Sequence, residues 1–330
     1  YWPNLGYGRF GPKVSMDTAP WFDTPDQFEP RRVRLADIDG SGTTDLFYIG
    51  RDGVRLYFNQ SGNAWSDPEP LPAFPRVDDL STVQALDLLG NGTACLVWTS
   101  SLPGDATRSM RYIDLMGGEK PHLLVRSWNN LGAETRVEYA PSTKFYLVDR
   151  QAGRPWLTRL PFPVHVVERV ETYDWLSRNR FVTRYTYHHG YYDGAEREFR
   201  GFGMVEQLDT EELGALGQTG TFPDAVNIDA ASYVPPVLTR TWFHTGAWPL
   251  GDRVSRHFED EYYRESDLSE GIVGLTDAKF EAMLLPDTVF PEGLASEEIR
   301  EACRSLKGAI LRQEVYALDG TEESDRPYSV

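Results

Sequence analysis

The stretch LADIDGSGTTDLFYIG, residues 35–50, decides the fold, because it places a tight polar loop between two segments with strand character. The residues leading into the loop, VRLA, and those leaving it, DLFYIG, include the β-branched and aromatic side chains that suit a pleated surface. Asp-Gly and Ser-Gly pairs between such segments are typical of turns. The stretch therefore predicts a strand, a short loop and a second strand.

The same pattern recurs further along the chain. VRLADIDGSGTTDLFYIG (33–50) aligns with VQALDLLGNGTACLVWTS (83–100), so Asp37 and Asp87 are in register and the repeat is 87 − 37 = 50 residues long. A period of roughly 40–50 residues, with about four strands in each unit, is typical of β-propeller blades. Two units are too few to close a propeller, so residues 1–122 are predicted to hold incomplete β-propeller blades.

The composition also favours an all-β protein. Gly 29, Pro 22 and an aromatic fraction of 13% in 330 residues are ordinary for a chain of many short strands and turns. A formal net charge of −17 with no clustered basic face argues against a nucleic-acid partner. Cys95 and Cys303 lie far apart in apolar surroundings, so we expect two buried thiols and no disulfide.

Residues 123–330 contain longer segments of strand character, which predict an extended antiparallel β-sheet. In the segment RNRFVTRYTYHHGYYDG, the side chains of Phe181, Thr183, Tyr185 and Tyr187 fall on one face of a strand, because strand side chains alternate between faces. No run of about 18 apolar residues is present, so we expect no direct membrane insertion.

A small helical insertion is expected within this sheet. The spacing of apolar residues predicts a helix over 297–307, capped by Ser296 and stopped by Gly308, and a shorter helix over 277–285. Residues 206–235 are acidic and rich in Gly and Thr, which indicates a loop excursion.

The loop between the first two strands offers oxygen ligands at every second position. Ca²⁺ takes six to eight oxygens, and this spacing of carboxylates around a turn of two glycines supplies most of them. We therefore predict a calcium site, and weigh it against an ion-free turn held by hydrogen bonds from the aspartates. The predicted metal ligands are Asp37, Asp39, Ser41, Thr43 and Asp45.

Other interpretations of this loop fit the sequence less well. An EF-hand requires a bidentate Glu at its twelfth position, which here is Tyr48, and helices on both sides. A phosphatase with Asp37 as nucleophile would follow a continuous aliphatic strand, whereas RRVRLA precedes it. The companion loop, 87–95, has Leu89 and Cys95 where carboxylates are required, so it is expected to keep the turn without an ion.

Two further motifs are interpreted as structural. Gly6, Gly8 and Gly11 match G-x-G-x-x-G, but neither a buried strand before them nor a helix after them is indicated, so they are expected to be turn residues. His188 and His189 are adjacent on a predicted strand, where side chains point to opposite faces, so we expect ordinary polar side chains near a strand end. No catalytic constellation is readable.

Several long stretches together carry a resemblance to a known family. They are WPNLGYGRFGPKV, the DIDGSGTTDL repeat, NNLGAETRVEYAPST, AGRPWLTRLPFPVHVVERVE, NRFVTRYTYHHGYYDGAEREFRGFGMVEQ and LKGAILRQEVYALDG. The sequence resembles the B-type subunit of bacterial insecticidal toxin complexes, the SpvB/TcdB-like proteins, and corresponds to a middle fragment of that subunit.

The resemblance implies a structural role in a secreted toxin complex. It implies that residues 1–122 are FG-GAP/VCBS-like blades of a propeller that docks to the pore-forming A-type subunit. It implies that residues 123–330 are RHS-like sheet of a hollow shell, which encloses the toxic cargo carried by the C-type subunit. In this family the B subunit is a container, so no catalytic residue is expected and the protein is not expected to be an enzyme.

Two functions from other classes stay open on the residues alone. One is a calcium-dependent adhesion or glycan-binding β-propeller module, because such propellers use similar acidic loops. The other is an enzyme, either a glycosidase with two facing carboxylates or a phosphatase that uses Asp37.

Overall fold

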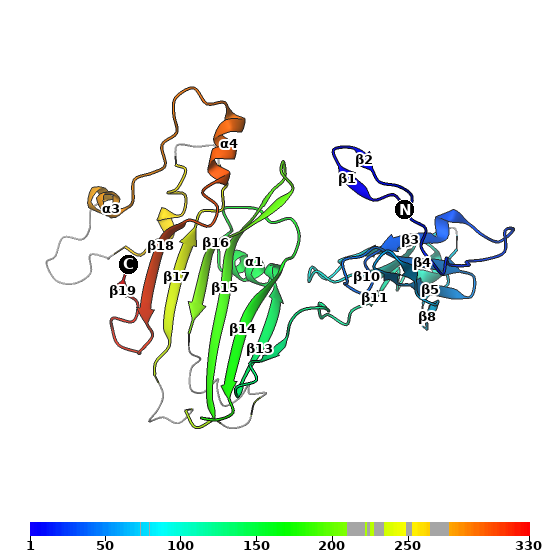
Figure 1. Cartoon of the computed structure of the whole chain (residues 1–330), viewed down its shortest axis with the longest axis horizontal. Helices are drawn as coiled ribbons and strands as arrows, with labels where there is room; N and C mark the ends of the chain where they lie inside the picture. The colour runs from blue at the N-terminus through cyan, green and yellow to red at the C-terminus, as the bar shows by residue number, and fades with distance from the viewer. Residues whose placement is uncertain are drawn as a thin grey trace. The chain divides into compact units, whose positions relative to one another are not determined.

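The computed structural model describes residues 1–72, 74–78, 80–209, 222, 225–227, 234–248, 253–264 and 277–330. The chain divides into two compact units, Tyr1–Leu123 and Leu124–Val330 (Figure 1). Both units consist mainly of antiparallel β-sheet, which confirms the all-β class. Most of the loop excursion predicted over 206–235 lies outside the described residues.

The first unit contains two main antiparallel sheets. One has four strands in the order β3-β4-β5-β8 and the other three strands in the order β11-β10-β9. Their bounds are β3 (Val33–Ala36), β4 (Asp45–Gly50), β5 (Gly53–Tyr57), β8 (Glu69–Leu71), β9 (Ser81–Leu86), β10 (Cys95–Ser100) and β11 (Met110–Asp114). The strand, loop and strand predicted at 35–50 are thus present as β3, the loop and β4.

Shorter elements complete this unit. The hairpin of β1 (Asn4–Gly6) and β2 (Arg9–Phe10) and the pair β6 (Asn59–Gln60) and β7 (Ala64–Trp65) are two-stranded sheets. The 3-10 helices η1 (Pro30–Arg32) and η2 (Pro103–Asp105) each begin with a proline, whose fixed backbone angle suits the first turn.

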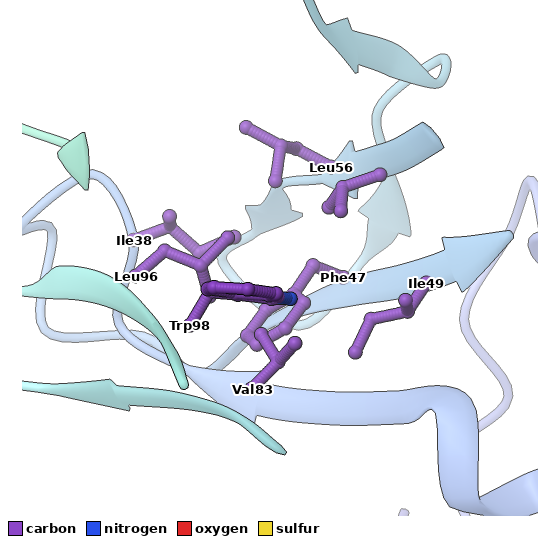
Figure 2. Packing of buried hydrophobic residues seen from close by; sticks show 8 residues of the cluster. Ile38, Phe47, Ile49, Leu56, Val83, Leu96 and Trp98 are labelled. Carbon is purple, nitrogen blue, oxygen red and sulfur yellow. The ribbon is translucent and has the colours of Figure 1, made fainter. Parts of the chain in front are cut away.

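The core of the first unit lies on both sides of β4. Phe47 and Ile49 belong to a buried cluster that includes Val83 and Trp98 of the other sheet, so the two sheets are packed together by one set of alternate side chains (Figure 2). Leu46 and Tyr48, the other set, pack with Tyr57 in a second cluster. Because both faces of β4 are covered, DLFYIG has an almost continuously apolar sequence.

The second unit is built on one eight-stranded sheet whose strands follow sequence order, each antiparallel to the next. This arrangement confirms the extended antiparallel sheet expected from the sequence. The strands are β12 (Arg126–Trp128), β13 (Ala133–Pro141), β14 (His165–Asp174), β15 (Asn179–Asp193), β16 (Glu198–Leu208), β17 (Val237–Phe243), β18 (Ile310–Ala317) and β19 (Pro327–Ser329).

The register of this sheet separates its side chains into two chemically different faces. Residues paired across antiparallel strands lie on the same face, and alternate residues along each strand lie on opposite faces. The charged face carries Glu134, Arg136, Glu138, Arg169, Glu171, Arg180, Glu206, Arg240, Arg312 and Glu314. The other face, called neutral although Asp174 at the end of β14 is an exception, carries Thr135, Val137, Val170, Thr172, Phe181, Thr183, Tyr185, Tyr187, Val205, Gln207, Thr239, Thr241, Gln313 and Val315.

The charged face carries ion pairs within and between its strands. Arg169 lies 2.9 Å from both Glu138 and Glu171, and Arg240 lies 2.8 Å from Glu206. Arg169 and Glu171 are almost completely buried, and buried charges are tolerated where they are paired in this way. The predicted common face of Phe181, Tyr185 and Tyr187 is confirmed and is the neutral one.

The helices of this unit agree with the sequence only in part. The two predicted helices are present as α3 (Asp277–Met283) and α4 (Ser296–Arg304), each shorter than expected at its C-terminal end. The N-cap of α4 is Ala295 and not Ser296, and the backbone N–H of Ala295 is bound by Glu298 at 2.7 Å. The 3-10 helix η3 (Glu259–Glu261) follows the buried ring of Phe258.

A third helix, α1 (Ser142–Gln151), was not predicted from the sequence. It follows β13 directly after Pro141, which stands at the N-cap. Only Ser142, Phe145 and Asp149 are buried, and two of the three are polar. A helix that buries a single apolar side chain has little hydrophobic periodicity, which is the signal that a sequence offers.

Candidate functional site

The loop that joins β3 to β4 turns on two glycines with positive φ, Gly40 at +71° and Gly42 at +85°. At Gly40 an added Cβ would also lie 2.7 Å from the ring of Pro121, so a side chain has no room there. The glycines thus allow the chain to fold back on itself. This brings the aspartates that precede and follow the turn close to one another.

Three of the five predicted ligands, Asp37, Asp39 and Asp45, are brought together by this turn. One carboxylate oxygen of each lies within 4.8 Å of the others. Asp45 is fully buried, and its two oxygens accept the backbone N–H groups of Ile38 and Asn59, each at 2.8 Å. Burial raises the pKa of Asp45, and the negative charge of Asp39 adds to this rise, against the two N–H donors. A cation would relieve both effects.

Asp37 has a buried oxygen that remains available. Its Oδ2 accepts the backbone N–H of Gly42 at 3.1 Å, whereas its Oδ1 is buried and has no hydrogen-bond partner. The N–H of Ser41, which could have reached Asp37, donates instead to Oδ1 of Asp39 at 2.9 Å. A buried carboxylate oxygen without a donor is costly in the absence of a cation.

The two predicted hydroxyl ligands are engaged with each other. Oγ of Ser41 lies 2.8 Å from Oγ1 of Thr43, and Thr43 also donates to the carbonyl of Asn59 at 3.3 Å. The structure therefore brings the three carboxylates into one group and places Ser41 and Thr43 in hydrogen bonds beside it.

The companion loop between β9 and β10 has the same backbone turn and a different closure. Gly90 and Gly92 have φ of +68° and +78°, close to their counterparts in the first loop. Here Asp87 accepts the N–H groups of Asn91 at 3.1 Å and Gly92 at 2.8 Å, so both of its oxygens are occupied. The difference follows from Leu89, which cannot accept an N–H as Asp39 does.

The chemistry of the first loop suits a hard cation. Three carboxylates with one unpaired buried oxygen match the oxygen donors that Ca²⁺ prefers, and water can complete the coordination. The phosphatase interpretation of Asp37 does not fit, because β3 is paired antiparallel with β4 and is not a strand of a parallel sheet.

The expectation for His188 and His189 was wrong. Both side chains are buried, with exposures of 6% and 4%, and both line one cavity. His189 has φ of +56°, and the register between β15 and β16 shifts between Gly190 and Tyr192. This irregularity breaks the strict alternation of side chains on which the expectation depended.

The two histidines connect the sheet to peripheral segments. Nδ1 of His188 lies 2.5 Å from Oδ2 of Asp149 in α1, and Nε2 of His189 lies 2.7 Å from Glu261 in η3. Burial acts to lower the pKa of His188, but Glu206 and Asp149 outweigh it, so the pKa is raised. Burial likewise opposes the ionised form of Glu206, yet His188 and Arg240 lower the pKa of Glu206 to about 2.

The early glycines and the two cysteines have structural positions. Gly6 and Gly8 form the turn between β1 and β2, with φ of +80° and +73°. Cys95 and Cys303 are free and fully buried, and burial raises the pKa of both thiols. No helix among the described residues has both the length and the apolar character that a membrane crossing needs.

Known protein families match most of the chain. Residues 59–246 match the family described as insecticide toxin TcdB middle/N-terminal region. Residues 301–330 match the family described as insecticide toxin TcdB middle/C-terminal region. Among curated proteins, none matches the chain.

Solved structures of toxin complexes are similar over almost the whole chain. A mutant Tc holotoxin pore of Photorhabdus luminescens contains a chain that is 32% identical over 99% of this chain, with a TM-score of 0.73. The crystal structures of TcdB2-TccC3-Cdc42 and TcdB2-TccC3 each contain a chain that is 31% identical in sequence over 99% of this chain, also with a TM-score of 0.73. The chain spans 14% of the first two matched chains and 15% of the third.

Proposed function

This chain belongs to the insecticide toxin TcdB family, and on that premise we propose that it is a structural segment of the B-type subunit of a secreted toxin complex. Its part in the complex is to form wall and docking surface, not to carry out a reaction. The observation that carries the proposal is the similarity over 99% of the chain to a component of a holotoxin pore. The solved structures of TcdB2 with TccC3 make a C-type subunit the first partner to test.

The second unit suits a role as part of a shell. Its eight strands form one wide sheet whose two faces differ, one charged and internally paired, the other covered by hydroxyl, amide and apolar side chains. Such a sheet can separate two aqueous spaces, because antiparallel sheets tolerate water on an outer face. Under this proposal the sheet is a portion of the RHS-like wall that encloses the cargo carried by the C-type subunit.

The first unit suits a role in docking. Its two antiparallel sheets repeat after 50 residues, with Asp37 and Asp87 at equivalent turns, and are packed face to face. Small sheets that pack on one another in this way are the building units of β-propellers. We propose that they are FG-GAP/VCBS-like blades of a propeller that the full subunit completes, and that this propeller contacts the pore-forming A-type subunit.

Calcium has a structural role in this proposal. The unpaired buried oxygen of Asp37 and the raised pKa of Asp45 both favour a cation in the first loop, and the ion would fix the turn between β3 and β4. Because both oxygens of Asp87 already accept backbone N–H groups in the companion loop, one ion for the two loops is expected.

The container role is tested by measuring whether the assembled complex protects its cargo from a protease. The full-length parent protein is co-expressed with the C-type protein, the complex is purified and its cargo segment is probed with a protease. We expect co-purification, a hollow particle by electron microscopy and a cargo that is cleaved only after the particle is opened by denaturant. A compact, filled particle or immediate cleavage of the cargo would contradict the proposal.

A further inference from the structure

A cavity of about 350 Å³ lies in the second unit, against the charged face of the sheet. It is bounded by α1, the strands β15, β16 and β17, and η3. Met204 and Trp242 give it an apolar portion, whereas most of its other lining side chains are ionisable. Four of these are carboxylates, Asp149, Glu206, Asp260 and Glu261, against the guanidinium groups of Arg154 and Arg240.

One buried nitrogen at this cavity has no hydrogen-bond partner. His188 is 6% exposed, and its Nδ1 is engaged with Asp149 at 2.5 Å. Its Nε2 is buried and forms no hydrogen bond. Because Asp149 is itself held by the indole N–H of Trp156 at 2.8 Å, the ring of His188 is fixed with Nδ1 toward α1 and Nε2 toward Glu206.

The atom that faces this nitrogen belongs to Glu206. Its Oε1 accepts from Nε of Arg240 at 2.8 Å, which fixes the carboxylate on the charged face. Its Oε2 lies 3.8 Å from Nε2 of His188, too far for a hydrogen bond. An imidazole nitrogen and a carboxylate oxygen thus face each other at the wall of an acidic cavity, each held by a partner on its other atom.

We propose that Nε2 of His188 and Oε2 of Glu206 are the two protein ligands of a divalent transition-metal ion of the Zn²⁺ class, with water in its other positions. Two tetrahedral ligands about 2.0–2.1 Å from one ion are roughly 3.4 Å apart, so the observed pair needs to close by only a few tenths of an ångström. Imidazole together with carboxylate suits Zn²⁺ and similar ions, and does not suit Ca²⁺.

Asp149 lies where a carboxylate would support His188 as a metal ligand. A histidine that binds a metal through one nitrogen usually donates from the other to a carboxylate or carbonyl, which fixes the ring and raises its basicity. The contact of 2.5 Å between Asp149 and Nδ1 of His188 is such an arrangement. A buried imidazolium that simply bridges the carboxylates of Asp149 and Glu206 is the alternative that the test must separate.

The test is a calorimetric titration of the 330-residue chain with ZnCl₂, made in excess CaCl₂ so that the acidic loop of the first unit is saturated. His188→Gln and Glu206→Gln each remove one ligand, and Glu206→Gln leaves the contact of His188 with Asp149 intact. His122→Gln is the matched control, because His122 is exposed and lies in the first unit. Asp149→Asn keeps both ligands and removes the negative charge beside Nδ1 of His188.

We expect one zinc site in the parent chain, meaning the 330-residue chain without substitutions, and in His122→Gln. His188→Gln and Glu206→Gln should each lose at least tenfold in zinc affinity. Asp149→Asn should weaken binding by about 10- to 100-fold. Co²⁺ bound in place of Zn²⁺ should give a visible absorption band that Glu206→Gln abolishes. Absence of a zinc site in the parent chain, or equal binding by the parent and Glu206→Gln, would overturn the proposal in favour of the imidazolium pair.

Discussion

Asp45 Oδ1 accepts the backbone N–H of Asn59 at 2.8 Å, and this bond ties the first residue of β4 to the first residue of β6, 14 positions later in the chain. The other oxygen of the same carboxylate holds the N–H of Ile38. A single buried side chain therefore fixes both the acidic loop and the segment that follows β5. The acidic loop has this role in stability whether or not it binds an ion.

Replacement of Asp45 by Asn should destabilise the first unit without any change in size. The amide nitrogen of Asn cannot accept an N–H, so one of the two buried donors, from Ile38 or Asn59, loses its partner. A buried donor left unsatisfied costs about 1–3 kcal/mol. Urea denaturation followed by tryptophan fluorescence measures the loss. Asp52→Asn, at an exposed position, is the control, and equal stability of the two variants would contradict the structural role of Asp45.

Calcium should raise the thermal stability of the chain through the first loop alone. At a calcium concentration about 10 to 100 times Kd, binding adds roughly 1–3 kcal/mol to the free energy of unfolding by mass action. Asp39→Asn should abolish the effect, because the Asn oxygen can still accept the N–H of Ser41 while the ligand charge is lost. Asp87→Asn, in the companion loop, should keep it.

Melting temperatures with CaCl₂ and with EDTA decide between the calcium site and the ion-free turn. A parent chain whose melting temperature is the same in both would show that hydrogen bonds alone close the loop.

Acid should destabilise the second unit through two neutral histidines, the buried His244 and the half-buried His257. His257 and His244 both face the carbonyl of Val254, each with a ring nitrogen 3.0 Å from it. Burial lowers the pKa of His257 to about 4, and repulsion from His244, when that ring is protonated, adds to this effect. Above pH 6.5 the imidazole is neutral in both folded and unfolded chains. As the pH falls from 6.5 to 4, the unfolded chain gains a proton that the folded chain does not.

The free energy of unfolding should therefore fall in that window by up to about 1.4 kcal/mol per pH unit on account of His257. Denaturation midpoints at several pH values between 7 and 4 measure the slope, and His257→Gln should flatten it relative to the exposed control His122→Gln. Parallel curves for the two variants would show that His257 does not titrate in this way.

The sequence predicts the features that depend on neighbouring residues. The turn at Gly40 and Gly42 and the convergence of Asp37, Asp39 and Asp45 lie within one loop of nine residues, so the spacing alone brings the carboxylates together. The face shared by Phe181 and its neighbours follows from strict alternation along β15. Such features need no knowledge of contacts distant in the chain.

The features that the sequence misses depend on tertiary structure. The contact between Asp149 and His188 joins residues 39 apart, and the helix α1 that supplies Asp149 has too few buried apolar residues to be recognised. The left-handed conformation of His189 is adopted by a residue with a Cβ, and no local pattern distinguishes it from its neighbours. Prediction from local sequence therefore fails where the backbone of a strand is irregular and where an ion pair joins residues distant in the chain.

The close approach of Phe258 to β16 gives a last prediction. An added Cβ at Gly203 would lie 2.3 Å from Cζ of Phe258 and 3.0 Å from Cβ of His189, so Gly203→Ala must displace a fully buried ring. Overpacking of a core costs about 1–3 kcal/mol or more. Gly194→Ala is the matched control, since nothing lies within 4 Å of its added Cβ. Because Phe258 immediately precedes η3, we expect Gly203→Ala to increase hydrogen exchange in residues 257–262 and Gly194→Ala to leave it unchanged. Equal exchange in the two variants would show that the packing of Phe258 against Gly203 does not hold this segment on the sheet.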